Sequence, residues 1–194
     1  LGCGPIEVAV CSTGLIGERL DMDRLLPGFT AAATTLATTG GDSAAVAIMT
    51  TDTVAKTAVA QAEGVTVGGM AKGAGMLAPG MATMLAVLTT DAVAEPDVLQ
   101  RVLSDAVART FNRVDSDGCM STNDTVVLMA SGASGVALSE ESLAALVTDV
   151  ASSLSRQLIA DAEGASKDIA IEVVGAADET DAEVAARSVA RSNL

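Results

Sequence analysis

Residues 64–92, "GVTVGGMAKGAGMLAPGMATMLAVLTTDA", set the organisation that we expect for this chain. The first seven residues predict a strand, which runs into a glycine-rich loop at 73–75. Pro79 and Gly80 then break the chain, and the apolar run that follows Thr83 is typical of a buried helix or strand. A threonine therefore opens a buried segment just after a turn, and its place there needs a reason.

The composition is that of a compact globular protein. The chain has 194 residues, of which 49% are hydrophobic and 19% are charged, enough for one domain with a sizeable core. Its net charge of −14 repels phosphate backbones and anionic membrane surfaces, and no uncharged apolar run approaches the roughly 20 residues that span a bilayer. We therefore expect neither a nucleic acid nor a membrane as partner.

The residue types that are missing limit the chemistry. The sequence has no His, Trp or Tyr, which excludes catalytic triads built on histidine and every metal site that needs it. Its three cysteines show no CxxC spacing, so they predict neither a disulfide framework nor a zinc site and suit a reducing cytosol. If the protein is an enzyme, we expect Lys, Asp, Glu or an α-amine to carry the protons.

Outside the opening stretch, strand-like and helix-like patterns follow one another with short connections. This mixed order predicts an α+β fold, a layered sandwich of mixed β-sheets and helices in one structural domain. The predicted strands begin at Ile6 and lie at 125–131 and 168–176; the predicted helices lie at 22–28, within 29–39, and at 97–111, 140–162 and 178–191.

Three short motifs have ordinary explanations. "GGMAKGAG" at 68–75 resembles a phosphate loop only loosely, because Lys72 precedes the last glycines and no Ser or Thr follows it. "DSDGC" at 115–119 begins like a calcium loop, but Val126 stands where the twelfth-position glutamate would be. "TND" at 122–124 is typical of turns and caps, since these side chains bind nearby backbone.

Thr83 allows a sharper hypothesis. A hydroxyl can attack the preceding peptide carbonyl in a strained turn, and hydrolysis of the resulting ester leaves a free N-terminal threonine. Its α-amine titrates near pH 7.7–8.0, so it can accept the proton of its own hydroxyl, and no histidine is needed. The ordinary alternative is that Thr83 only caps the segment that follows it.

The same stretch resembles the cleavage site of the glutamate N-acetyltransferase family, also called ornithine acetyltransferases, whose members cut themselves between Ala and Thr of "MAT". Four other blocks match the family in its order: "EVAVCSTGLIGERL" at 7–20, "AIMTTDT" at 47–53, "FNRVDSDGCMSTNDTV" at 111–126 and "DAEGASK" at 161–167. The resemblance implies an autoprocessed fold of the N-terminal-nucleophile type. Family members usually extend beyond both ends, so we expect this sequence to be a piece of a longer protein.

The resemblance also implies roles for single residues. Ala82–Thr83 would be the bond that is cut, and Thr83 the nucleophile that is acetylated. Thr13 and Gly14 match the pair that stabilises the oxyanion. The substrate-binding positions that match, besides Thr83 itself, are Thr50, Lys72 and Glu163; a lysine suits a carboxylate and a glutamate suits an amino group.

The reaction implied is a ping-pong transfer of acetyl from N2-acetyl-L-ornithine to L-glutamate through an acetyl-Thr83 ester. It needs no cofactor and no metal, although some family members also take acetyl-CoA as the donor. The resemblance further implies a cytoplasmic heterotetramer of two α and two β pieces in arginine biosynthesis. Residues 1–82 would end the α piece and residues 83–194 would begin the β piece.

Two alternatives stay open. An autoprocessed aminopeptidase or amidase would pass its acyl group to water, and the family-like Lys72 and Glu163 argue against it. The second alternative is an inactive fragment that needs partner segments to fold, and the parts of the family that this sequence lacks favour it.

Overall fold

The computed structural model describes residues 2–15, 17–77, 84–121 and 123–192. Its centre is a four-stranded sheet with the order β1-β2-β3-β4. Strand β2 is antiparallel to both of its neighbours, β1 and β3, and β3 and β4 are parallel. The strands are β1 (Lys56–Ala62), β2 (Val65–Lys72), β3 (Leu85–Thr90) and β4 (Thr125–Ala130).

The connections follow from this pairing. Glu63 and Gly64 join β1 to β2 in a two-residue turn with φ of 52° and 79°, which suits the twist of an antiparallel hairpin. The parallel pair needs a crossover, and the helix α3 (Pro96–Arg109) supplies it between β3 and β4.

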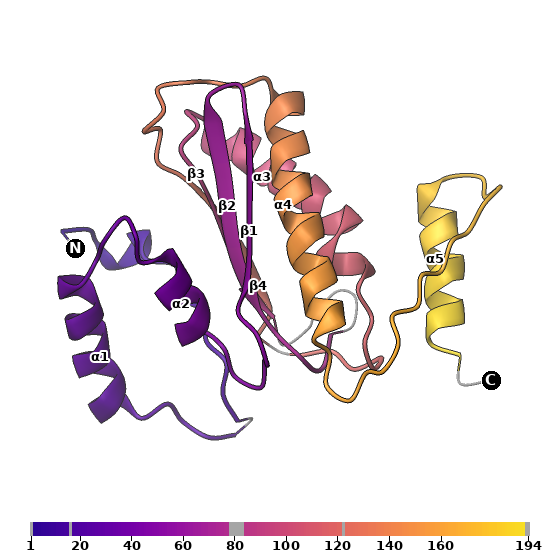
Figure 1. Ribbon diagram of the computed structural model, residues 1–194, viewed down its shortest axis with the longest axis horizontal. Helices are drawn as coiled ribbons and strands as arrows, with labels where there is room; N and C mark the ends of the chain where they lie inside the picture. Colours follow the sequence, from indigo (N-terminus) through magenta and orange to yellow (C-terminus); the bar gives the residue numbers. More distant parts are fainter. Residues whose placement is uncertain (1, 16, 78–83, 122, 193–194) are drawn as a thin grey trace.

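Helices α3 and α4 (Glu140–Ala160) pack against each other and cover one face of the sheet (Figure 1). Helix α4 lies along β1 and β2, and α3 contacts β4. Ser139 caps the N-terminus of α4: its hydroxyl accepts a hydrogen bond from Ser142 N at 3.0 Å. The core lies between these two layers. Its buried hydrophobic side chains include Val65, Val67, Leu88, Val102, Leu143, Val147, Val150 and Leu154.

The opposite face of the sheet is only partly covered in the described part of the chain: helix α2 (Gly41–Ala47) contacts β1 and β2, and Lys72, on this face, is fully buried. Side chains alternate along a strand, so Val59 of β1 and Met129 of β4 point away from α4. Val59 is 68% exposed and Met129 is 49% exposed. Polar side chains share this face, among them the exposed Thr57, Gln61 and Thr89, so the surface is mixed rather than apolar.

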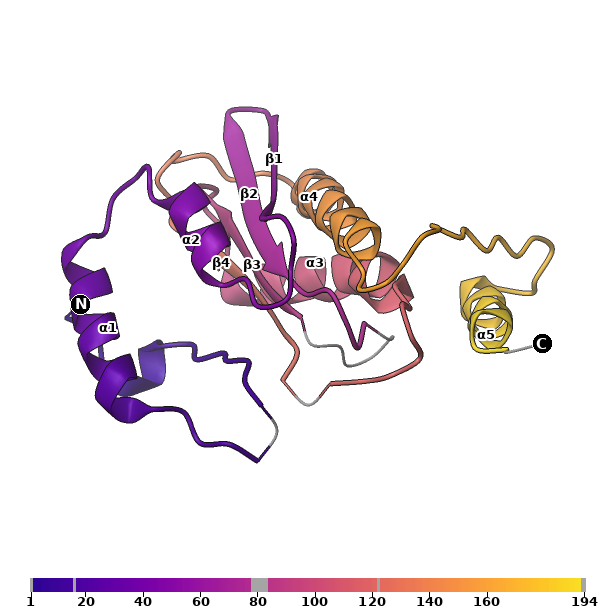
Figure 2. The same ribbon diagram turned by 60° about the horizontal axis from the view of Figure 1, so that its bottom comes forward.

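The elements at the two ends of the chain contribute little to the core. Helices α1 and α5 hold no buried residue, and they lie to either side of the sheet in both views (Figure 1, Figure 2). These outer elements are η1 (Pro5–Glu7), α1 (Met22–Thr34), α2 (Gly41–Ala47) and α5 (Glu179–Ala190); the short turn η2 (Phe111–Arg113) follows α3. No helix among the described residues has both the length and the apolar character needed to cross a bilayer.

The predicted α+β fold is confirmed, and so are the helices at 97–111, 140–162 and 178–191 and the strands at 64–70 and 125–131, within a few residues. The ambiguous run after Thr83 is a strand, β3. The described residues form one sheet, and the further layers of a sandwich stay a prediction.

Three predictions were wrong. No strand forms at Ile6, where η1 lies, or at 168–176, because a β-rich segment becomes a strand only beside another strand, and no described strand lies next to either. The helix at 22–28 does not end at Pro27 and Gly28. Asp21 caps it through the N–H groups of Asp23 and Arg24, and the alanines after Gly28 carry it on to Thr34.

Candidate active site

The ends of three strands meet in one row. Lys72, the last residue of β2, pairs with Leu85 of β3, which in turn pairs with Thr125 of β4. One residue before this row, Met84 and Asp124 lie side by side. Met84 N donates a hydrogen bond to Asp124 Oδ1 at 2.9 Å, and Thr125 N donates one to Met84 O at 3.1 Å. The row therefore joins Lys72 to the start of β3.

Lys72 is a buried cation with few partners. Its side chain has no exposed surface, and its one hydrogen-bond partner among the described residues is Thr50 Oγ1, 3.4 Å from Nζ. Burial lowers the pKa of Lys72 below its ordinary value, while the charges of Asp52, Asp124 and Cys11 act against that change. An ammonium group has three donors, so Lys72 can bind a further acceptor.

Asp124 has a carboxylate oxygen that can accept a further hydrogen bond. Its Oδ2 is buried and has no hydrogen-bond partner among the described residues. Burial raises the pKa of Asp124, and the hydrogen bond from Met84 and the charge of Lys72 oppose this only in part. A buried carboxylate oxygen without a donor is costly, and such groups are rare in folded proteins.

A buried ion cluster of Lys56, Asp52 and Asp161 contacts Gly73, the residue that follows Lys72. Lys56 Nζ is 2.7 Å from Asp52 Oδ1 and 2.6 Å from Asp161 Oδ2, and neither Lys56 nor the Asp52 side chain is exposed. Asp52 also accepts from Gly73 N at 2.6 Å and from Thr50 N at 3.1 Å. Burial alone would raise the pKa of Asp52, but these three donors lower it overall. The cluster thus fixes Thr50 and the residue that follows Lys72.

The same cluster reaches the end of α4. Asp161 accepts hydrogen bonds from Thr53 N at 2.9 Å and from Thr53 Oγ1. Its pKa is about 2, because the bonds from Lys56 and Thr53 outweigh the effect of burial, which alone would raise it. Two residues later, Glu163 N donates to Ala74 O at 2.6 Å.

The exposed carboxylate of Glu163 lies against the glycine-rich loop. A Cβ on Gly75 would lie 3.4 Å from Glu163 Oε2, an ordinary contact distance that places this carboxylate beside the loop. Three of the predicted substrate-binding residues, Thr50, Lys72 and Glu163, therefore lie around the loop at 73–75. Among the described residues, no group of three or more His, Cys, Asp or Glu side chains has a metal-binding arrangement.

The predicted oxyanion pair is less fully defined. The hydroxyl oxygen of Thr13 is buried and has no partner among the described residues. Gly14 is exposed, with Leu20 as the nearest side chain to it, and no hydrogen bond of Gly14 is found in the described part of the chain. Ala82 and Thr83, the predicted cleavage site and nucleophile, lie outside the described residues.

Sequence reasoning missed four acidic or basic residues of this region: Asp52, Lys56, Asp124 and Asp161. Lys56 offered a signal, because a lysine inside an otherwise uncharged run at 54–62 needs a counter-ion if that run is buried. The expected turn or cap bond of Asp124 to nearby backbone is not what its Oδ1 makes: it accepts from Met84 N, 40 residues away in the chain.

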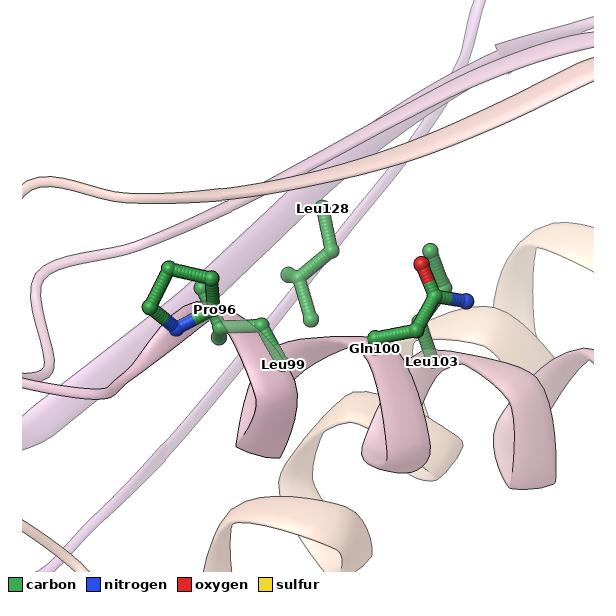
Figure 3. A pocket seen from close by; sticks show the side chains of 5 residues that line it. All are labelled: Pro96, Leu99, Gln100, Leu103 and Leu128. Carbon is green, nitrogen blue, oxygen red and sulfur yellow. The ribbon is translucent and has the colours of Figure 1, made fainter.

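A separate hollow lies between α3 and β4 (Figure 3). Its lining is apolar except for one amide, and consists of Pro96, Leu99, Gln100, Leu103 and Leu128. It carries no titratable group, and none of the predicted site residues belongs to it.

Comparisons with known proteins agree with the resemblance seen in the sequence. The family model described as "ArgJ family" matches residues 1–194. The chain is similar to arginine biosynthesis bifunctional protein ArgJ 1 of Streptomyces clavuligerus, at 62% identity over 194 residues, all of this chain and 51% of that protein. It is also similar to arginine biosynthesis bifunctional protein ArgJ of Mycobacterium leprae, at 58% identity over 98% of this chain and 48% of that protein.

The chain spans about half the length of the curated relatives that it matches. Among solved structures, the PH0078 protein from Pyrococcus horikoshii aligns with a TM-score of 0.34 and 16% identity, over 55% of this chain and 38% of its own. That likeness is too weak to bear on the fold.

Proposed function

The chain belongs to the ArgJ family, and we propose that it forms the nucleophile-bearing part of an acetyltransferase of arginine biosynthesis. The proposed reaction moves the acetyl group of N2-acetyl-L-ornithine to L-glutamate. The observation that supports it most is Lys72, a buried ammonium with one hydrogen-bond partner among the described residues. Its paired residue in β3, Leu85, follows Thr83 by two positions. A buried cation favours an anionic ligand, and both amino acids carry a carboxylate.

The nucleophile would come from self-cleavage. Attack of the Thr83 hydroxyl on the Ala82 carbonyl, followed by hydrolysis, frees the α-amine of Thr83. That amine can take the hydroxyl proton when Thr83 attacks the acetyl donor, and the acetyl group then waits as an ester until glutamate takes it. Donors from Thr13 and Gly14 would stabilise the oxyanion, and loss of one such donor typically costs roughly 10²–10³ in rate.

The charges around the loop at 73–75 suit amino-acid substrates. Lys72 and Thr50 would hold a substrate carboxylate, since one supplies an ammonium and the other a hydroxyl within 3.4 Å of it. Glu163, whose carboxylate is exposed beside Gly75, would take an amino group such as the side-chain amine of ornithine. The ester stores the acetyl group, so the reaction needs no cofactor, although acetyl-CoA would serve as an alternative donor.

The proposed cut divides the sheet between β2 and β3, which pair from Val67 to Lys72 and from Leu85 to Thr90. This pairing supports residues 1–82 and 83–194 as parts of one structural domain, the end of an α piece and the start of a β piece. The face of the sheet away from α3 and α4 is only partly covered among the described residues, and the second layer of a sandwich of the N-terminal-nucleophile type would pack there. We propose a cytoplasmic heterotetramer of two α and two β pieces.

The first test is the intact mass of the purified protein, with N-terminal sequencing of any smaller species. We expect two pieces, one ending at Ala82 and one beginning at Thr83, and a single uncut species for Thr83→Ala. An uncut wild-type chain would contradict the proposed activation.

The second test is transfer itself. Acetylornithine carrying a labelled acetyl group should leave the label on the piece that begins at Thr83, and added glutamate should remove it as acetylglutamate. Failure of the cleaved protein to take the label would refute the proposed function. Release of the label as free acetate, at the same rate with and without glutamate, would instead identify a hydrolase.

A further inference from the structure

Asp124 lies immediately before β4, and only one of its two carboxylate oxygens has a hydrogen-bond partner among the described residues. Its Oδ1 binds Met84 N at 2.9 Å, and Met84 follows Thr83 directly in the chain. Its Oδ2 is buried and has no hydrogen-bond partner among the described residues. A carboxylate oxygen that is kept from water and from protein donors is set up to receive a donor from a ligand.

The other carboxylates of the region are not available in this way. Both oxygens of Asp52 accept hydrogen bonds, from Lys56, Gly73 and Thr50. Both oxygens of Asp161 are also occupied, by Lys56 and Thr53. Glu163 is exposed to solvent.

We infer that Asp124 is the acid–base residue for the substrate amine: its free oxygen takes a proton from the amino group that attacks the acetyl ester and returns one to the amine that leaves. This inference rests on the proposed acetyl transfer and adds a group that handles the amine proton. Burial also raises the pKa of Asp124, which brings it closer to that of a working general base.

The protons and bonds balance as follows. The acceptor arrives as an ammonium, and one of its protons passes to Asp124 Oδ2. The freed lone pair forms a C–N bond to the acetyl carbon, the C–O bond to Thr83 breaks, and a second amine proton passes through the Thr83 α-amine to the Thr83 oxygen. The third proton stays on the amide, and Asp124 keeps the proton that it took. In the first half-reaction of the next cycle, Asp124 gives this proton to the departing ornithine amine, the α-amine passes on the proton of the Thr83 hydroxyl, and ornithine leaves as an ammonium.

The test uses the full-length protein and compares its acetylation by two acetyl donors, 4-nitrophenyl acetate and acetylornithine. The leaving group of 4-nitrophenyl acetate is a phenolate that departs without a proton, whereas ornithine has to be protonated as it leaves. Asp124→Asn keeps an Oδ1 acceptor for Met84 N and removes the charge. Asp117→Asn is the matched control, since Asp117 also accepts backbone N–H groups, from Met76 and Cys119, but is exposed.

We expect Asp124→Asn to be acetylated by 4-nitrophenyl acetate within about threefold of the wild-type rate. Acetylation by acetylornithine, and removal of the acetyl group by glutamate, should both fall by roughly 10²–10⁴-fold, the usual contribution of a general acid or base. Asp124→Glu should recover part of this loss, and Asp117→Asn should match the wild type with both donors.

Two results would overturn the inference. One is an Asp124→Asn protein whose acetylation rate falls by the same factor with both donors, or stays at the wild-type rate with both. The other is the same loss of helical circular dichroism in Asp124→Asn and Asp124→Glu, which would assign Asp124 a purely structural role. A wild-type protein that is never acetylated at Thr83 would instead refute the proposed function, and the two failures are therefore distinguishable.

Discussion

The buried ion cluster can be tested by removing the cation that joins its two carboxylates, Lys56. Lys56 has no exposed surface and holds two carboxylates, at 2.7 Å from Asp52 and 2.6 Å from Asp161. Methionine has a similar length and is apolar, so Lys56→Met fills the space but leaves two buried carboxylates with no counter-ion.

Breaking a buried ion pair from one side typically costs about 3–5 kcal/mol. A domain has about 5–15 kcal/mol of free energy of unfolding in total, so this loss is a large share of it. For a chain of this size, 1 kcal/mol shifts the thermal midpoint by about 2–4 °C, and we therefore expect Lys56→Met to unfold about 6–20 °C lower. The loss should shrink as the pH falls towards 5, because the two carboxylates can then take up a proton.

The assay is thermal and urea unfolding followed by circular dichroism, with Arg101→Met as the matched control. Arg101 makes a two-bond pair with Glu140, at 2.9 and 2.7 Å, on the exposed surface of α3 and α4. We expect little change in that control, since water and salt screen exposed pairs. A loss below about 1 kcal/mol in Lys56→Met, or one equal to that in the control, would show that the cluster does not hold the site together.

Three further outcomes can be measured by the same unfolding assays. The pKa of Asp161, about 2 in the folded protein, lies below its ordinary value of 3.8. Its contribution of about 2 kcal/mol to the free energy of unfolding is therefore present above pH 4 and is lost as the pH falls towards 2. Asp161→Asn should lack this part of the acid transition, and an unchanged acid profile would contradict the assignment. Gly69→Ala would put a Cβ within 3.0 Å of α4 side chains and should cost about 1–3 kcal/mol, whereas Gly68→Ala, which meets nothing closer than 3.9 Å, should be neutral; equal effects would mean that α4 moves aside freely. Ser139→Ala removes the cap of α4 and should cost about 1 kcal/mol, and no measurable change would mean that water replaces the hydroxyl at Ser142 N.

The parts of the fold that could be predicted are those whose local pattern agrees with their tertiary surroundings. Helix α4 has both a serine cap and a continuous apolar face, so its sequence alone locates it. Strand β1 escaped prediction because its residues, "KTAVAQA", have weak strand propensity, and pairing with β2 is what makes them a strand.

The residues of the candidate site could also be predicted only in part. The resemblance predicts Thr50, Lys72 and Glu163 one by one as substrate-binding residues, and these residues lie around a single loop. The cluster that positions them could not be predicted, because Lys56 and Asp161 are far apart in sequence and meet only when α4 packs on β1. Long-range ion pairs of this kind have no periodicity that a single sequence would show.

The seam between β2 and β3 has a consequence for the order of events in the cell. The two strands pair along six residues each, and the bond expected to be cut lies in the connection between them. While that connection is intact, each strand meets the other at an effective concentration of the order of millimolar, as tethered segments do. Pieces made separately would have to find each other by diffusion, with unpaired strand edges exposed to every other chain. With the proposed self-cleavage, the uncut chain would guide its own assembly, and the cut would have to follow the formation of the sheet.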